Sequence, residues 1–186
     1  MRLGDGTELP ADLVVVGIGA DPAIEWLESS GLDLDNGLIC DSTLHAGHDV
    51  WAAGDVARWT NPLFDRGMRL EHWTNAGEQA AHAMTNLLDP ASATEYSHVP
   101  YFWSDWYGQR IQFAGLPIGE PELVTGRWDG DAFVALYREG DRLIGALALN
   151  RRGDIMKYRA LLARGADWNA ALDLASRRNV SAPIPA

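Results

Sequence analysis

The sequence contains a single cysteine, Cys40. One thiol cannot build a disulfide framework or a C-x-x-C redox pair within the chain, so we expect Cys40 to pack as a small apolar side chain in a strand. The five histidines lack the spacing of metal ligands, and we predict no metal site. No apolar window is long enough to cross a membrane, and the first ten residues do not resemble a signal peptide. These absences predict a soluble, cytoplasmic protein.

Positive charge is scarce in the first half of the chain. Residues 1–99 contain 4 Arg or Lys against 16 Asp or Glu, whereas residues 100–186 contain 11 against 10. So acidic a chain is unsuited to nucleic acid or to an anionic membrane surface. The second half nevertheless has a local basic cluster, formed by Arg151, Arg152, Lys157, Arg159 and Arg164. It is either a solvated helix face or a docking patch for an acidic protein.

The segment Thr43–Asp55 has the sequence TLHAGHDVWAAGD. Its apolar run stops at Gly54 and Asp55, which predicts a buried strand ending in a tight Gly-Asp turn. Such a turn holds Asp55 at the rim of a sheet, where its carboxylate can accept a hydrogen bond from a ligand hydroxyl. The alternative is a turn aspartate without a functional role.

A helix is predicted after an arginine-containing loop. Small or apolar residues recur at helical spacing from Ala76 to Leu88, and Asp89-Pro90 ends the pattern. Thr74 or Asn75 can cap the helix start. A helix N-terminus carries free N–H groups and about half a positive charge, which favours a nearby anion. The alternative is an ordinary amphipathic helix with a tryptophan staple at Trp73.

Residues 89–100 are a polar, proline-bounded connector, at which we place a domain boundary. Aromatic residues crowd the next segment, from Tyr101 to Tyr107, as is usual in a core or a domain interface. The remainder predicts a small α+β unit, with strands at 111–114, 133–138 and 143–149 and helices at 155–163 and 168–176. Nothing in this unit offers a nucleophile or an oriented base.

Three of these motifs together carry a family resemblance. The order T-x6-V-W-A-A-G-D (Thr43–Asp55), then RLEHWTNAGEQAA (Arg69–Ala81), then YFWSD (Tyr101–Asp105) resembles FAD-dependent pyridine-nucleotide ferredoxin reductases of the putidaredoxin and rhodocoxin reductase type. The resemblance covers most of the chain and corresponds to the C-terminal half of such an enzyme. It implies a mixed α+β and α/β fold: the C-terminal part of a two-dinucleotide-domain flavoprotein reductase, followed by a small α+β C-terminal reductase domain.

The resemblance also implies roles for individual residues. Asp55, after Gly54, would bind the ribityl chain of FAD, while His72 and Trp73, after Glu71, would lie against the isoalloxazine ring. Trp103 would cover the flavin from the C-terminal domain. NAD(P)H would reduce FAD in the full-length form, and a ferredoxin-type iron-sulfur protein would accept the electrons. The partner would dock in part on Arg151, Arg152, Lys157 and Arg159.

The N-terminal residues predict a strand that lacks neighbours. Residues 2–9 read as a hairpin, and Leu13–Ile18 is a continuous apolar run typical of a strand covered on both faces. Gly17 and Gly19 do not form a dinucleotide loop, because the third glycine is missing. In the reductases that the chain resembles, such a G-x-G ends the NAD domain. We therefore expect a remnant of the NAD-binding domain at 1–20, the C-terminal segment of the FAD-binding domain at 21–95 and the reductase domain at 96–186.

An orphan strand would leave backbone groups unpaired, so we expect that an N-terminal portion or a second chain supplies the rest. Alone, the chain would bind FAD weakly or not at all and would not turn over. Two alternatives stay open at this stage. One is a non-enzymatic interaction module formed by residues 96–186. The other is a different FAD/NADH oxidoreductase of the same architecture, such as an NADH oxidase or a nitrite reductase component.

Overall fold

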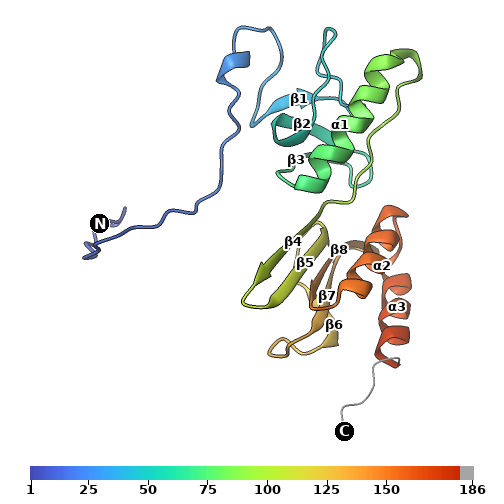
Figure 1. The fold of residues 1–186 in the computed structure, drawn as a ribbon. Helices are drawn as coiled ribbons and strands as arrows, with labels where there is room; N and C mark the ends of the chain where they lie inside the picture. The colour runs from blue at the N-terminus through green and yellow to red at the C-terminus, as the bar shows by residue number, and fades with distance from the viewer. Residues whose placement is uncertain (181–186) are drawn as a thin grey trace.

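The computed structural model describes residues 1–180 as two sheets, each with its own helices (Figure 1). The first sheet has three strands in the order β1-β2-β3, and the second has five in the order β4-β5-β8-β7-β6. The predicted mixed α/β and α+β fold is therefore confirmed. The last six residues of the predicted segment 96–186 lie outside the described residues.

The first sheet is small and contains one parallel and one antiparallel pair. Its strands are β1 (Leu38–Cys40), β2 (Ala57–Asn61) and β3 (Arg66–Arg69); β1 pairs with β2 in parallel, and β2 pairs with β3 as a hairpin. Cys40 is buried in β1 as expected, and burial raises the pKa of its thiol to about 12. Helix α1 (Trp73–Leu88) lies beside this sheet. Residues 56–70, expected to be a loop, instead supply β2 and β3.

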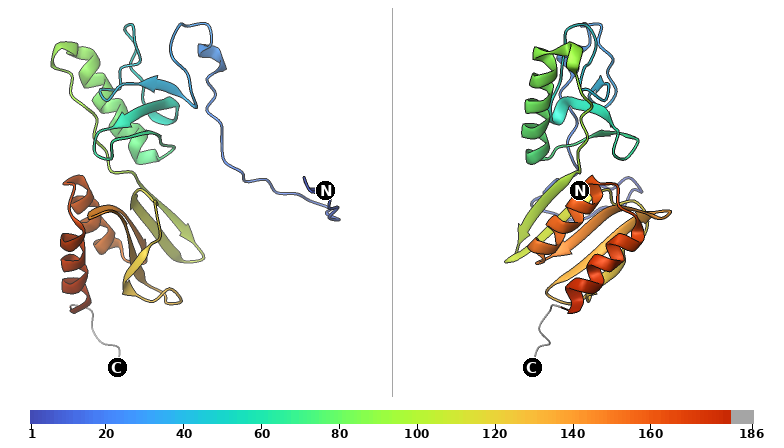
Figure 2. Two further views of the ribbon diagram at one scale, coloured as in Figure 1. Left: turned by 180° about the vertical axis from the view of Figure 1, so that it is seen from behind. Right: turned by 90° about the vertical axis from the view of Figure 1, so that its right-hand side faces the viewer.

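The second sheet is antiparallel throughout and forms a two-layer unit with two helices. Helices α2 and α3 cover one face of it (Figures 1 and 2). The predicted strands and helices of this unit are confirmed, but the sequence missed β4 and β6. The elements are β4 (Tyr101–Trp106), β5 (Gln109–Gly115), β6 (Glu122–Gly126), β7 (Phe133–Glu139), β8 (Arg142–Leu149), α2 (Arg152–Ala163) and α3 (Trp168–Val180).

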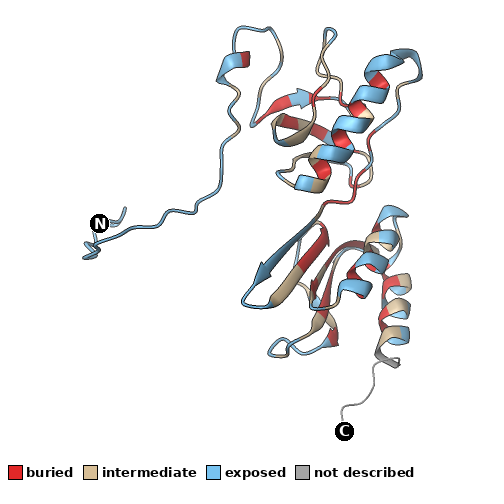
Figure 3. Ribbon diagram, viewed as in Figure 1, coloured by how far each residue is buried: buried red, intermediate tan, exposed pale blue. Residues whose placement is uncertain are grey.

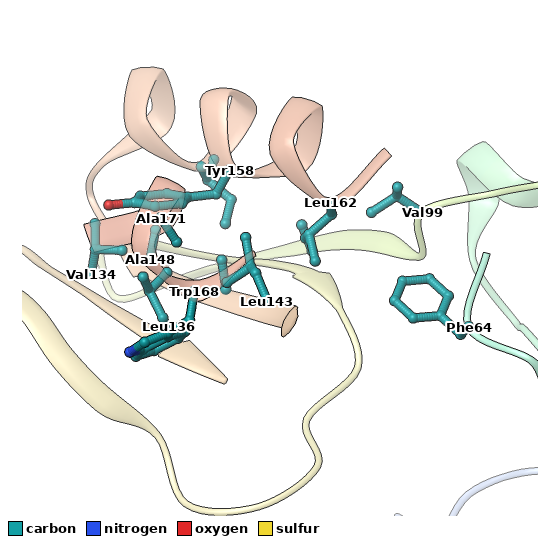
Figure 4. Close-up of a cluster of buried hydrophobic side chains, with 13 residues drawn as sticks. Phe64, Val99, Val134, Leu136, Leu143, Ala148, Tyr158, Leu162, Trp168 and Ala171 are labelled. Carbon is teal, nitrogen blue, oxygen red and sulfur yellow. The ribbon is translucent and has the colours of Figure 1, made fainter. Parts of the chain in front are cut away.

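The core of the second unit lies between the sheet and its helices (Figure 4). Leu136 and Leu143 from the sheet meet Tyr158 and Leu162 from α2, and all four are almost completely buried. The same cluster includes Phe64, which follows β2 of the first sheet. The two halves of the chain therefore share apolar contacts.

The N-terminal segment departs from the prediction. Arg2 and Glu8 form a single bridge, so the expected hairpin exists in minimal form. Leu13–Ile18 is not a strand covered on both faces: it runs clear of both sheets, and Leu13, Val15 and Ile18 are 81%, 87% and 91% exposed (Figure 3). The prediction of a buried strand is wrong for this segment, because no strand of residues 1–180 pairs with it.

The predicted buried strand at Thr43–Asp55 is also wrong. This segment is a loop that turns back on itself, with an isolated bridge between His45 and Trp51 and positive φ angles at Leu44 and His48. The chain makes a 3-10 turn at Gly54–Val56, and the strand begins only afterwards, at Ala57. The Asp41 carboxylate accepts from the Thr43 and His45 N–H groups at 2.8 and 3.1 Å, and the chain then turns again at Gly47 and His48, so no continuous strand can form.

Candidate functional site

The N-terminus of α1 is the centre of the candidate site. The predicted helix is confirmed, but the predicted cap is wrong: His72 occupies the N-cap, and within residues 1–180 no side chain caps the first turn. Thr74 and Asn75 lie inside the helix. The Thr74 hydroxyl donates to the Tyr101 main-chain carbonyl at 3.2 Å. The Asn75 side-chain oxygen Oδ1 accepts from the Tyr96 hydroxyl at 3.2 Å. The N–H groups of the first turn therefore remain available to a ligand.

Helix α1 buries a different face from the one predicted. Met84, Leu87 and Leu88 are exposed, whereas the buried positions are Asn75, Gln79, Ala83 and Asn86. The reason is that α1 packs on loops, where main-chain groups need partners. The Asn86 amide donates to the carbonyls of Thr43 and Thr94 at 2.8 and 2.9 Å, and it accepts from the Thr94 N–H at 3.1 Å. Buried amides therefore replace the expected apolar contacts.

Gly54 and Asp55 lie beside the same helix. Gly54 has a φ of +76°, a conformation that favours glycine, and a Cβ at this position would lie 3.6 Å from the Cβ of Ala76. The Gly54 N–H donates to the Gln79 side-chain oxygen at 2.8 Å. The turn that carries Asp55 is therefore held directly against α1.

A groove connects Asp55 with the aromatic residues of β4. Asp55, Glu71 and Trp73 line one concavity together with Ala76 and Gly77. Glu71, His72 and Trp73 line an adjoining concavity together with Phe102 and Trp103. We call this continuous surface the α1 groove and define it by Asp55, Glu71, His72, Trp73, Phe102 and Trp103. All the predicted site residues therefore converge, with Gly54 at the edge.

The groove offers large exposed aromatic surfaces. Trp73 is 89% exposed and Trp103 is 43% exposed, although indole rings are usually well covered in a folded chain. The His72 ring packs against Phe102, with centroids 5.3 Å apart. Its Nδ1 atom is buried and has no hydrogen-bond partner within the described residues. A flat ring system would cover these indoles.

Burial favours the neutral form of two histidines near the groove, His72 and His98. Burial lowers the pKa of His72, and the negative charges of Asp55 and Glu71 oppose this shift without overcoming it. Burial also lowers the pKa of His98, although its Nδ1 lies 2.9 Å from Glu78. Both imidazoles are therefore stabilised in the uncharged form.

The lowered pKa values of His72 and His98 predict that the free energy of unfolding falls in mild acid. The unfolded histidines take up protons near pH 6.5, whereas the folded ones resist protonation. The histidine contribution is thus fully present above about pH 6.5 and is lost as the pH falls through the folded pKa values. Urea unfolding at pH 7.5, 6.5 and 5.5 measures the slope. His98→Gln should flatten it, whereas His48→Asn, at an exposed position, should not; equal slopes in all three proteins would contradict the assignment.

The structure separates the predicted basic cluster into two kinds of residue. Arg159 pairs with Glu78 at 3.4 Å and lies over the Tyr101 ring, and Arg151 pairs with Asp154 at 3.7 Å. Arg152 and Lys157 are exposed on α2. Arg151 and Arg159 therefore have structural contacts, whereas the other three members of the cluster, Arg152, Lys157 and Arg164, are exposed to solvent.

Sequence reasoning missed several residues of the site. For Phe102 the only indication in the sequence was the general aromatic character of its segment. For Ala76 and Gly77 the only indication was their small size. Arg69 and Gln79 lie within the motif Arg69–Ala81 but received no role, because an arginine in a supposed loop and a glutamine in a supposed amphipathic helix are expected to be exposed to solvent. In the described part of the chain no cluster of three His, Cys, Asp or Glu side chains could hold a metal ion. Across residues 1–180 no helix has both the length and the apolar character of a membrane span.

The chain is similar to known proteins along most of its length. A family model described as pyridine nucleotide-disulphide oxidoreductase matches residues 1–80, and one described as reductase C-terminal matches residues 101–178. The chain is 39% identical over 165 residues to the ferredoxin–NAD(+) reductase component of the anthranilate 1,2-dioxygenase system of Burkholderia cepacia, covering 87% of this chain and 40% of that protein. It is 36% identical over 149 residues to putidaredoxin reductase of Pseudomonas putida, covering 79% of this chain and 35% of that protein.

Solved structures show the same similarity. A ferredoxin reductase for the CYP199A2 system from Rhodopseudomonas palustris superposes with a TM-score of 0.82 at 31% identity, covering 96% of this chain and 45% of that chain. The covalent putidaredoxin reductase–putidaredoxin complex superposes with a TM-score of 0.77 at 28% identity, with the same coverage. The chain spans 35–40% of the length of the two curated relatives. It belongs to the pyridine nucleotide-disulphide oxidoreductase family over residues 1–80 and to the reductase C-terminal family over residues 101–178, and it is similar to part of the ferredoxin reductases.

Proposed function

We propose that this chain forms part of a flavoprotein oxidoreductase that passes electrons from NAD(P)H through FAD to a ferredoxin. The observation that carries the proposal is the α1 groove, in which the uncapped α1 terminus, Asp55 and Trp103 meet. Bound FAD would supply the chemistry, because a flavin accepts a hydride as an electron pair and returns electrons singly. The residues of the chain bind and orient it.

Each groove residue has a role that follows from its position. The Asp55 carboxylate accepts a hydrogen bond from a ribityl hydroxyl. The first-turn N–H groups of α1 lie where negative charge on a reduced flavin would be stabilised, because the helix terminus is positive and its first turn carries no acidic side chain. Trp73, His72 and Trp103 cover the ring and exclude water. Glu71 is held at the groove by Arg69, whose Nη1 donates to it at 2.7 Å.

We further propose that an N-terminal segment or a second polypeptide completes the cofactor site. Two exposed apolar surfaces support this: the run from Leu13 to Ile18, and the side of α1 that carries Met84 and Leu88. In this scheme residues 1–20 belong to the NAD-binding domain, 21–95 to the FAD-binding domain and 96–186 to the reductase domain. The chain alone would then bind FAD weakly or not at all.

The proposed electron acceptor is a ferredoxin-type iron-sulfur protein. The name of the covalent complex pairs the related reductase with putidaredoxin, and the docking of an acidic partner needs exposed cations. Arg152 and Lys157 meet that need on α2. Arg151 and Arg159 contribute less, because their guanidinium groups already pair with Asp154 and Glu78.

A chimera tests the proposal. Residues 1–178 would replace the matching segment of the Burkholderia cepacia reductase component, and the product would be assayed for bound FAD and for NADH-dependent reduction of a ferredoxin. We expect a yellow, active protein. Asp55→Ala should weaken FAD binding by about 10–100-fold, since a hydrogen bond to a charged group contributes about 1.5–3 kcal/mol. Asp49→Ala, at an exposed position in the preceding loop, should leave the affinity unchanged.

Other outcomes would favour other functions. A folded, colourless chimera that still binds a ferredoxin would overturn the proposal in favour of an interaction module. A yellow chimera that reduces only oxygen would point to an oxidase of the same architecture. Equal FAD affinity for the Asp55→Ala variant and the parent would remove Asp55 from the site.

A further inference from the structure

The turn that carries Asp55 is held from two sides by side chains of other elements. On one side Gln79, which is completely buried in α1, accepts the Gly54 N–H at 2.8 Å. On the other side Arg69, at the end of β3, donates from Nη1 to the Asp55 carbonyl at 3.0 Å. The two bonds fix the peptide groups on both sides of the Gly54–Asp55 link.

The Gln79 amide has a defined orientation. Its oxygen accepts from both the Gly54 N–H and the Asn75 Nδ2, at 2.8 and 3.3 Å, and a flipped amide would place a donor against both. Its Nε2 is buried and lacks a partner among the described residues, and such a group lowers stability. Gln79 therefore lowers stability through its unpaired Nε2 but fixes the Gly54 N–H through its oxygen. We infer from this combination that its role is to position the turn.

Arg69 is fixed as well. The same Nη1 that donates to the Asp55 carbonyl also donates to Glu71 at 2.7 Å, so one guanidinium links two groove residues. Its side chain is only 11% exposed. The stem packs over Gly37, where an added Cβ would lie 2.9 Å from the Arg69 Cδ. Gly37 therefore leaves the space that this arginine needs.

We propose that Gln79 and Arg69 are positioning residues that hold the Asp55 carboxylate in its binding position in the α1 groove. The inference rests on the proposed function for its cofactor, but the contacts themselves belong to this chain. Arg69 also fixes Glu71, so it orients two sides of the groove at once. Gln79 acts only through Gly54 and Asp55.

The first test measures the turn in the chain itself, without cofactor. In Gln79→Met the Gly54 N–H loses its acceptor, and its hydrogen exchange, followed by NMR, should accelerate by about tenfold or more, as expected for loss of a bond worth about 1.4 kcal/mol. Gln79→Glu keeps an oxygen acceptor and should restore slow exchange. Asn86→Leu is the matched control, because Asn86 is a buried amide of the same helix that contacts other loops. The Asn86→Leu substitution should not accelerate hydrogen exchange of the Gly54 N–H beyond the change that its effect on global unfolding causes.

The second test measures the consequence in the FAD-binding chimera. Gln79→Met and Arg69→Met should each raise the Kd for FAD by about tenfold and alter the flavin absorbance band. Asn86→Leu and Arg66→Met should lower stability without either change; Arg66 is a β3 arginine that pairs with Glu139 instead.

Three results would overturn the inference. They are unchanged Gly54 exchange in Gln79→Met, unchanged FAD affinity in both positioning variants, and an equal loss of affinity in Asn86→Leu. If the unaltered chimera binds no FAD, the proposed function fails, and the inference fails with it as a statement about the cofactor. The exchange measurement still decides separately whether Gln79 holds the turn.

Discussion

Replacing Trp59 by alanine is expected to lower the free energy of unfolding by about 3–5 kcal/mol, the usual range for deleting a buried aromatic side chain. Trp59 lies in β2 and is only 1% exposed, and it belongs to the apolar cluster under the first sheet. Its ring packs 5.6 Å from Tyr96, and its Nε1 donates to the Tyr96 carbonyl at 3.2 Å. Alanine would leave a cavity and an unpaired carbonyl.

Urea unfolding followed by circular dichroism measures this effect. The matched control is Trp128→Ala, since Trp128 is 51% exposed and should contribute less than about 1 kcal/mol. A loss of less than about 1 kcal/mol for Trp59→Ala would show that the first sheet does not depend on this residue. The connector that carries Tyr96 should also become more accessible to proteases, because Trp59 fixes its carbonyl.

Replacing Gly145 by alanine is expected to destabilise the second sheet by about 3 kcal/mol or more, the upper part of the range for overpacking. Gly145 in β8 pairs with Gly115 in β5 in the antiparallel ladder, at a point where the backbone of the next residue, Leu116, comes very close. An added Cβ would lie 2.3 Å from the Leu116 carbonyl oxygen, and backbone cannot move aside as a flexible side chain does. The strands must therefore separate locally, and the Leu116 N–H would lose its 2.8 Å bond to the Ile144 carbonyl.

Gly67→Ala is the control for this substitution. Gly67 lies in β3, and an added Cβ there meets nothing within 4 Å. Thermal and urea unfolding of both variants should show a large loss for Gly145→Ala and a change within about 0.5 kcal/mol for Gly67→Ala. A stable Gly145→Ala protein would mean that β5 and β8 adjust their spacing at little cost.

Strands β5, β7 and β8 and both helices of the second unit could be predicted from sequence because they carry regular apolar patterns, whereas β4, which is almost entirely exposed, and the short β6 could not. In the first half the existence of α1 could be predicted but its buried face could not, for reasons that the contacts show. Helix α1 packs on loops, so Asn75, Gln79 and Asn86 face inward while Met84 and Leu88 face solvent. A periodicity of apolar residues cannot reveal a buried face made of amides. Likewise Leu13–Ile18 has the composition of a buried strand, but its burial needs a partner strand that residues 1–180 do not provide.

The candidate site could be predicted because its residues lie in short motifs that meet at one helix terminus. Asp55, Trp73 and Trp103 line adjoining concavities although they come from three separate segments. The residues that hold them could not be found in this way. Gln79 and Arg69 act through single hydrogen bonds to backbone groups, and only the fold shows which backbone groups lie within reach.

The extended run between Pro10 and Pro22 also has a consequence for handling the protein. Its aliphatic side chains and its unpaired main-chain groups face solvent, and two copies of such a run can align into a cross-molecule sheet. Asp12 and Asp21, beside these prolines, stand where gatekeeper residues commonly restrain aggregation. We therefore expect that self-association of the purified chain, where it occurs, begins at the residues between Asp12 and Asp21.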